Sequence, residues 1–289
     1  MTKDNEATSE TLEALSPKWY IPTLYVADAT KNQILWFRFW SNSSGIFIPS
    51  GLGGLNFPQG LLGTWPHDLL VASGGGNAIL KYDWHGNFAS DFVPPGGGGL
   101  AGPVSLDYGP GPDYDVYVSV YRGGVLRYAS ASGAFLGTLV PAGSGGLVNP
   151  GTMISGRDLY VADERQVLRY NGITGAFLGI FVPSGSGGLG YIGSMAFGFD
   201  GNLYVTDYSN HRVLRYDGAT GAFLNVFIPA GSGGLSGPRG LAFGPDGMLY
   251  IACRNTADVR RYDGRTGAFV DIAIPTASGL DEPVELLVY

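Results

Sequence analysis

Residues 203–235 read LYVTDYSNHRVLRYDGATGAFLNVFIPAGSGGL, and this pattern recurs along almost the whole chain. Each copy begins with a short apolar segment, passes through a polar loop to VLRY, and ends in a TGAF turn and a glycine-rich run. The copies start at Leu24, Leu69, Val116, Leu159, Leu203 and Leu249. Their spacings of 45, 47, 43, 44 and 46 residues are typical of a propeller blade of four short strands.

Hydrophobic periodicity and turn residues predict four strands in each repeat. Gly244-Pro-Asp-Gly247 has proline and glycine where a tight turn needs them, and Asp217-Gly-Ala-Thr-Gly221 is a hairpin turn. The strands predicted on this basis, in the order of a blade, are 240–243, 249–252, 213–216 and 222–228. The run 229–234 then crosses to the next blade.

The two ends of the chain complement each other. The first repeat starts at a second strand, 24–27, whereas residues 283–289 match a first strand. We therefore expect an all-β, six-bladed β-propeller with four-stranded antiparallel blades, in which strand 283–289 joins the N-terminal blade and closes the ring. Residues 21–289 form one propeller on this interpretation, and the polar, acidic residues 1–20 are predicted to be a disordered tail.

Composition supports an all-β fold and narrows the function. The chain has 289 residues, including 48 glycines and 18 prolines, which argue against a helical bundle. The net charge of -7 disfavours a nucleic-acid partner. Cys253 is the single cysteine, no apolar run is long enough for a membrane span, and residues 1–20 contain no secretory h-region. These features predict a cytoplasmic protein, with secretion after removal of a leader as the alternative.

The repeat resembles a known family. Residues 238–250 (PRGLAFGPDGMLY) and 210–216 (NHRVLRY) look like the NHL repeat, and the likeness covers residues 22–289. It implies a six-bladed propeller of the NHL or streptogramin-lyase-like kind, in which ligands bind at the mouth of the central channel. Such a fold hosts binding modules and enzymes alike.

Comparison between the repeats separates scaffold from candidate site. The aspartate after the second strand recurs as Asp28, Asp163 and Asp207, and we expect it to cap its own loop. The arginine of VLRY also recurs in several blades, which indicates a surface or blade-to-blade role. In the implied topology the crossovers and the second-to-third loops share one face, where loops on a rigid scaffold carry function.

Polar residues that vary between repeats on this face are the candidate ligand-binding residues. They are Gln59, Arg122, Arg165, Asp207, Tyr208, Arg212, Arg239, Arg254 and Glu285. Arg239, Arg212 and Arg254 belong to the fifth and sixth blades, beside Glu285 of the closing blade, and an arginine cluster suits a carboxylate or phosphate. A network of salt bridges around a water-filled channel is the alternative interpretation.

Catalytic and metal-binding patterns are sparse. The chain has no HExxH, nucleophile elbow or P-loop. The resemblance to streptogramin lyases, which use a metal with a histidine and an acidic residue, makes His211 and Glu285 the candidate catalytic residues. Sugar-lactonase and esterase propellers, a second resemblance, hold a divalent cation with inner-strand Glu, Asn and Asp residues. Here the starts of the inner strands supply Glu285 alone, with Gln59 and hydroxyl groups. We therefore predict no cofactor and assign no metal ligands, while Ca²⁺ or Mg²⁺ in the channel stays open.

The sequence thus predicts a non-catalytic binding propeller. Its partner is a protein or a small anionic ligand at the loop face around the channel. The alternative is an enzyme, a metal-dependent lyase or a hydrolase of the lactonase or esterase type, with its site at the same mouth.

Overall fold

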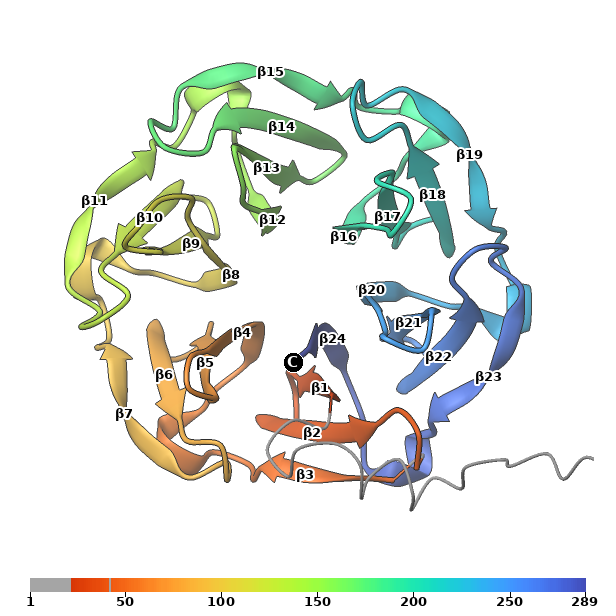
Figure 1. Ribbon diagram of the computed structural model, residues 1–289, viewed down its shortest axis with the longest axis horizontal. Helices are drawn as coiled ribbons and strands as arrows, with labels where there is room; N and C mark the ends of the chain where they lie inside the picture. The colour runs from red at the N-terminus through yellow and green to blue at the C-terminus, as the bar shows by residue number, and fades with distance from the viewer. Residues whose placement is uncertain (1–21, 42) are drawn as a thin grey trace, which may run out of the picture.

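The computed structural model describes residues 22–41 and 43–289, and they form a ring of six blades (Figure 1). Each blade is an antiparallel sheet of four strands. The predicted all-β six-bladed propeller is therefore confirmed, whereas the predicted tail 1–20 lies outside the described residues. Among the residues that are described, no helix is long and apolar enough to cross a membrane.

The strands nearest the channel carry three of the nine candidate positions, Gln59, Arg239 and Glu285. These inner strands are β4 (Pro58–Thr64), β8 (Pro103–Tyr108), β12 (Pro150–Ile154), β16 (Ile192–Phe197), β20 (Pro238–Phe243) and β24 (Pro283–Val288). The second strands are β1 (Thr23–Asp28), β5 (Asp68–Ser73), β9 (Val116–Val120), β13 (Asp158–Asp163), β17 (Leu203–Asp207) and β21 (Met248–Cys253).

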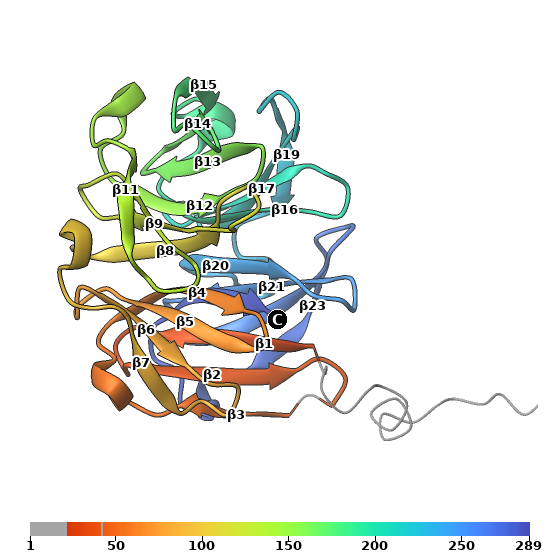
Figure 2. The ribbon, with the colours of Figure 1, turned by 60° about the vertical axis from the view of Figure 1, so that its left-hand side comes forward.

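The outer half of each blade contains the VLRY and GAF segments of the repeat. The third strands are β2 (Gln33–Arg38), β6 (Ala78–Tyr82), β10 (Val125–Tyr128), β14 (Gln166–Asn171), β18 (Arg212–Tyr216) and β22 (Asp258–Asp263). The outer strands are β3 (Ser44–Ile48), β7 (Phe88–Val93), β11 (Phe135–Val140), β15 (Phe177–Val182), β19 (Phe223–Ile228) and β23 (Phe269–Ile274). Each crossover contains a short 3-10 turn: η1 (Leu52–Gly54), η2 (Gly97–Gly99), η3 (Ser144–Gly146), η4 (Ser186–Gly188), η5 (Ser232–Gly234) and η6 (Thr276–Ser278). In Figure 2 the orange and gold turns η1 and η2 lie at the left edge of the ring, and the C-terminus lies to the right of them.

The C-terminal strand closes the ring as predicted. β24 pairs antiparallel with β1, with Tyr25 opposite Leu287 and Val26 opposite Leu286. The Tyr289 N–H donates to the Thr23 carbonyl at 2.9 Å, and the Thr23 N–H donates to the Tyr289 carbonyl at 2.8 Å. The first and last described segments thus share one sheet.

Apolar side chains fill the space between neighbouring blades. One cluster joins the closing blade to the blade of β20 to β23 and contains Leu24, Val26, Phe37, Tyr250 and Leu286, all buried. Equivalent clusters lie between the other blades. The core is therefore a ring of interfaces, so each blade depends on both neighbours.

The crossovers are anchored by the repeated tyrosine and phenylalanine. The Tyr216 hydroxyl donates to the Ser186 carbonyl of η4 at 2.8 Å, and the Phe223 ring packs against the Tyr216 ring. Gly187 in the same turn has φ +61°, and a Cβ atom there would collide with the Phe223 ring. Four further tyrosines donate in the same way: Tyr82 to Leu52, Tyr128 to Gly97, Tyr170 to Ser144 and Tyr262 to Ser232. VLRY, GAF and the glycine-rich run therefore form one structural unit.

Deletion of residues 283–289 should abolish cooperative unfolding of the propeller. Loss of β24 removes Leu286 from the interblade cluster and exposes Leu24 and Val26. Each lost apolar side chain costs about 2–5 kcal/mol, and a domain has a total stability of roughly 5–15 kcal/mol. Thermal melts followed by circular dichroism check this, with Leu286→Ala as the milder matched variant. A truncated chain that melts with wild-type cooperativity would contradict the closure argument.

Candidate ligand site at the channel mouth

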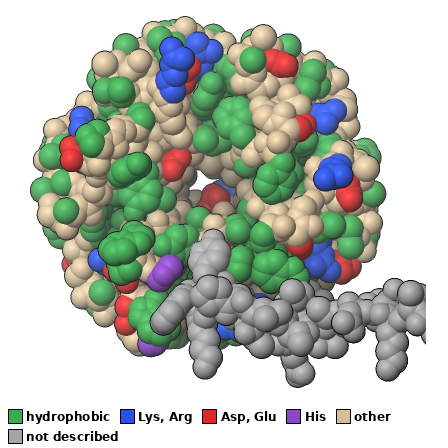
Figure 3. Space-filling view, in the orientation of Figure 1, with side chains coloured by type: hydrophobic (Ala, Val, Ile, Leu, Met, Phe, Trp, Pro, Cys, Tyr) green, Lys and Arg blue, Asp and Glu red, His purple; other side chains and the backbone are tan. Residues whose placement is uncertain are grey.

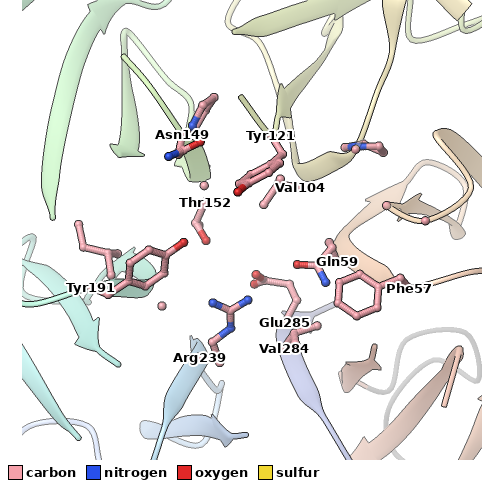
Figure 4. A pocket seen from close by; sticks show the side chains of 18 residues that line it. Phe57, Gln59, Val104, Tyr121, Asn149, Thr152, Tyr191, Arg239, Val284 and Glu285 are labelled. Carbon is pink, nitrogen blue, oxygen red and sulfur yellow. The ribbon is translucent and has the colours of Figure 1, made fainter. Parts of the chain in front are cut away.

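A cavity of about 390 Å³ lies at the channel end that carries the crossovers and the second-to-third loops (Figure 4). We call it the mouth cavity. Its lining includes the side chains of Phe57, Gln59, Val104, Tyr121, Asn149, Thr152, Tyr191, Arg239, Val284 and Glu285. The two loop sets that were predicted to share one face therefore surround one cavity.

Bulges in the inner strands aim side chains into the mouth cavity. Pro238 lies opposite Cys253 and Leu241 opposite Ile251, so Arg239 and Gly240 together face a single residue of β21. β4 has the same bulge, which contains Gln59. Because a bulge redirects the extra residue, Arg239 and Gln59 turn away from the sheet and into the cavity.

A glycine allows two inner strands to approach closely beside the cavity. A Cβ atom on Gly240 would lie 2.8 Å from the Glu285 Cα atom, so β20 and β24 can sit this close only because residue 240 is glycine. The consequence is that Arg239 and Glu285, from neighbouring blades, lie next to each other (Figure 4).

The floor of the mouth cavity presents polar groups without protein partners. Figure 4 shows the Arg239, Glu285 and Gln59 side chains turned toward the same space. The Arg239 Nε and Gln59 Nε2 atoms are buried, and neither has a hydrogen-bond partner within the described part of the chain. The Arg239 guanidinium lies over the Tyr208 ring, 5.8 Å from its centre, which holds the arginine in place.

Glu285 is a carboxyl group that retains its proton at neutral pH. Enclosure by protein raises the pKa of Glu285 to about 8, although the Leu286 N–H and the Arg239 charge act in the opposite direction. Near pH 7 the floor therefore carries a guanidinium, an amide NH₂ and a protonated carboxyl, all of which can donate to an anion.

Aromatic side chains form the rim of the mouth cavity. Phe57, Tyr121 and Tyr191 are 41%, 51% and 39% exposed. The Asn149 Nδ2 donates to Glu164 Oε1, while the Asn149 Oδ1 is buried without a partner. An apolar rim above a polar floor is the usual arrangement of a small-molecule site.

Arg212 and Asp207 form a hydrogen-bonded ion pair outside the cavity. The Arg212 Nε donates to Asp207 Oδ2 at 3.0 Å, and an Arg212 terminal nitrogen donates to the Gly188 carbonyl at 2.7 Å. Asp207 is fully buried and also accepts the N–H groups of Gly190 and Asn210. The expected capping role of this aspartate is confirmed, and the cap extends to the crossover that contains η4.

The remaining candidates also lie away from the cavity lining. The Arg254 Nε pairs with Glu282 Oε1 at 2.7 Å, and the Arg122 guanidinium lies over the Tyr121 ring. Arg165 is exposed. The His211 Nδ1 accepts the Gly237 N–H at 2.9 Å, and His211 does not line the cavity that Glu285 lines.

The structure thus brings three of the nine ligand-binding candidates, Gln59, Arg239 and Glu285, into the mouth cavity, with Tyr208 behind Arg239. Arg212 and Arg254 pair with carboxylates instead of joining Arg239. Across residues 22–41 and 43–289, no group of three His, Cys, Asp or Glu side chains could hold a metal ion. Ligand binding by the nine residues, and a cation in the channel, stay predictions.

Sequence reasoning overlooked three residues of the rim and the wall. Phe57, Asn149 and Tyr191 occupy the position before the first residue of an inner strand, where other blades have Gly102, Gly237 and Glu282. The residue type at this position varies between the blades as much as the type at the second residue of the inner strand, where Gln59 and Arg239 lie. A comparison of the repeats that began one residue earlier would have found them.

Comparisons with known proteins support the fold. No family model matches the chain, and no curated protein matches it. Among solved structures, a chain of the nidogen/laminin complex is similar with TM-score 0.74 and 16% identity over 92% of this chain and 98% of that chain. Virginiamycin B lyase from Staphylococcus aureus is similar with TM-score 0.57 and 18% identity over 79% of this chain and 73% of that chain. A catalytically inactive form of that lyase with quinupristin gives 17% identity at the same TM-score and coverage. The expected resemblance to propellers of this kind, a lyase among them, is confirmed at the level of the fold.

Glu285 should make stability depend on pH, and Glu285→Gln should remove this dependence. The pKa of Glu285 is about 8 in the folded chain against an ordinary value of 4.5, so the folded state binds more protons between these values. The stabilising contribution of Glu285 to the free energy of unfolding is complete below pH 4.5 and is lost as the pH rises through 8. Thermal melts should show that the melting temperature of wild type falls relative to that of Glu285→Gln from acidic to alkaline pH. A constant difference across this range would contradict the assignment.

Proposed function

We propose that this protein is a binding propeller that holds a small anionic molecule with an apolar body in the mouth cavity. The observation that carries the proposal is Arg239, a guanidinium that faces the cavity with a buried nitrogen and no acceptor for it in the described chain. Burial of an unsatisfied charged donor is unfavourable, and a bound carboxylate or phosphate would satisfy it.

The contrast with the other arginines supports this assignment. Arg212, Arg260 and Arg261, which are also largely shielded from solvent, each form an ion pair with a carboxylate. The exposed Arg122, Arg165 and Arg265 form no ion pair within the described residues, but water can solvate them. Arg239 forms no such pair within the described residues, although Glu285 lies beside it in the cavity. Enclosure raises the pKa of Glu285 to about 8, so this neighbour is uncharged near pH 7. The positive charge of Arg239 is therefore available to a ligand.

The size and the walls of the cavity favour a small molecule. Its volume of about 390 Å³ lies within the usual range of roughly 300–1,000 Å³ for ligand sites. Phe57, Tyr121 and Tyr191 supply aromatic surface for an apolar body. A protein partner stays the alternative: the similar structures include one chain from a protein complex, and an acidic side chain could reach Arg239 from above the rim.

One observation favours an enzyme as the second candidate function. Glu285 lies beside Arg239 and has a pKa of about 8, so it can donate or accept a proton near neutral pH. A lyase is among the similar structures. The mouth cavity would then bind an anionic substrate through Arg239, with Glu285 as the general acid or base.

Arg239→Gln should weaken the binding of a simple carboxylate. We expect 4-phenylbutanoate to bind wild type in a 1:1 complex, and the variant to lose about 1.5–3 kcal/mol, or roughly 10- to 100-fold in affinity, with the charged hydrogen bond. Isothermal titration calorimetry checks this. Affinity should also fall as the pH rises through about 8, because ionised Glu285 repels the anion.

Two controls give this experiment its specificity. Arg165→Gln removes an exposed arginine outside the cavity lining and should leave the affinity unchanged. The neutral analogue 4-phenylbutanol should not distinguish Arg239→Gln from wild type. Equal loss of affinity in both arginine variants would point to a diffuse surface charge effect and remove the mouth cavity as the site.

Divalent cations should have no effect on the propeller. Hard cations require several oxygen ligands, and of the residues that line the mouth cavity only Glu285 supplies a carboxyl group. We expect purified protein to contain no stoichiometric metal by mass spectrometry and to melt at the same temperature with Ca²⁺, Mg²⁺ or chelator. A stoichiometric cation whose removal leaves the fold intact would favour the enzyme alternative.

A further inference from the structure

A second cavity of about 390 Å³ occupies the channel beyond the mouth cavity. We call it the apolar cavity. Its lining includes Val288 at the end of β24, so it opens toward the face that carries the C-terminus. Figure 3 looks onto this face and shows an opening at the centre of the ring, bordered by hydrophobic side chains and with acidic groups at its wall. Thr152 and Glu285 line both cavities, so the two adjoin at these residues.

Most of the side chains that line the apolar cavity are hydrocarbon or aromatic. Leucine, methionine and phenylalanine side chains from the inner strands face it, among them Leu106, Met153, Met195, Phe197, Leu241 and Phe243. Methionine is flexible and polarisable, so it adapts to apolar ligands of varied shape. Phe199, at the rim, is 76% exposed and stacks edge-on against Phe243.

Two acidic side chains interrupt this surface: Glu285, where the two cavities adjoin, and Asp107. Asp107 is the fifth residue of its inner strand, and the equivalent residues of the other blades are Leu62, Ile154, Ala196, Ala242 and Leu287. Besides Glu285, Asp107 is the other carboxylic acid on the six inner strands. A carboxyl at a position that the repeat otherwise keeps apolar departs from the structural pattern of the repeat.

Asp107 has hydrogen-bond donors but no counter-charge. Its Oδ2 accepts the Ser155 N–H at 2.7 Å and its Oδ1 accepts the Tyr108 N–H at 2.8 Å. No lysine, arginine or histidine among the described residues forms an ion pair with it. Burial raises the pKa of Asp107 to about 6, so the group is ionised at slightly alkaline pH. Each oxygen keeps a free lone pair for a further donor.

We propose that the apolar cavity binds a hydrophobic ammonium, a primary or secondary amine whose protonated nitrogen donates to Asp107 and whose hydrocarbon body packs against Leu106, Met195 and Phe243. The ammonium supplies the positive counter-charge that Asp107 lacks, and its hydrogen bond to the carboxylate is charge-assisted. This site takes the opposite charge from the mouth cavity and does not depend on the function proposed there.

A matched series of probes tests the proposal. 4-Phenylbutylamine, which is protonated at about pH 7.5, is titrated into the full-length protein by calorimetry alongside 4-phenylbutanol. We expect the amine to bind at least about tenfold more tightly than the alcohol. In Asp107→Asn the affinity for the amine should fall to the affinity for the alcohol. In Arg239→Gln the affinity for the amine should stay unchanged.

Methionine methyl resonances locate the amine independently of affinity. With ¹³C-methyl-methionine, the signals of Met153 and Met195 should shift on addition of the amine, and the signal of Met248, which does not line the cavity, should not. Ala196→Leu narrows the cavity and leaves Asp107 in place, so it should lower the affinity for both probes. This variant is the alternative test if Asp107→Asn does not fold.

The outcomes separate this proposal from the proposed function. Equal affinity for amine and alcohol, or unshifted Met153 and Met195 signals, would overturn the ammonium site. Binding of 4-phenylbutanoate that survives in Asp107→Asn and fails in Arg239→Gln concerns the mouth cavity alone. Amine binding that is lost in Arg239→Gln and kept in Asp107→Asn would overturn the assignment to Asp107.

Discussion

The hydroxyl of one repeated tyrosine fixes where each crossover lies, and the channel mouth depends on it. Tyr216 and its four counterparts donate to the first carbonyl of the crossover turn, while a phenylalanine ring covers the left-handed glycine that follows. The closing blade has Phe37 instead of this tyrosine, and its crossover turn, η6, contains no left-handed residue. The closing blade therefore lacks both the tyrosine hydrogen bond and the left-handed glycine of the crossover turn. Residues just after each turn, such as Tyr191, reach the mouth cavity from a fixed position.

The site follows from two departures of the inner strands from regular sheet. A bulge sends Arg239 and Gln59 into the channel, and Gly240 lets β20 approach β24 until Arg239 lies beside Glu285. Bulk at residue 240 would separate the strands, and a regular pairing would return Arg239 to the sheet face. The polar floor is thus a property of the backbone as much as of the side chains.

The repeat made the fold readable from the sequence, because turn residues and apolar strands recur at one period. The same comparison identified Gln59, Arg239 and Glu285, since these vary where the scaffold does not. It did not predict the partners of Arg212 and Arg254. Those pairings depend on the path of the loops that bring Asp207 and Glu282 within reach, which periodicity does not encode. Asp107 was overlooked because the repeats were compared only at the beginning of the inner strands, and this carboxyl lies at the fifth residue.

The two inner-strand carboxyls divide the channel into halves of opposite chemistry. Glu285 borders Arg239 and, with its raised pKa, adds a donor to a cavity that already carries a positive charge. Asp107 has a pKa nearer the acidic range and no cationic neighbour, so it places a negative charge among apolar side chains. Thr152 and Glu285 lie where the halves meet. A ring that was only a scaffold would gain nothing from charges of opposite sign at the two ends of its channel, because each is unfavourable to bury alone. Glu285 and Asp107 stand where the other blades have small or apolar residues, and this placement supports the two proposals for ligand binding in the channel.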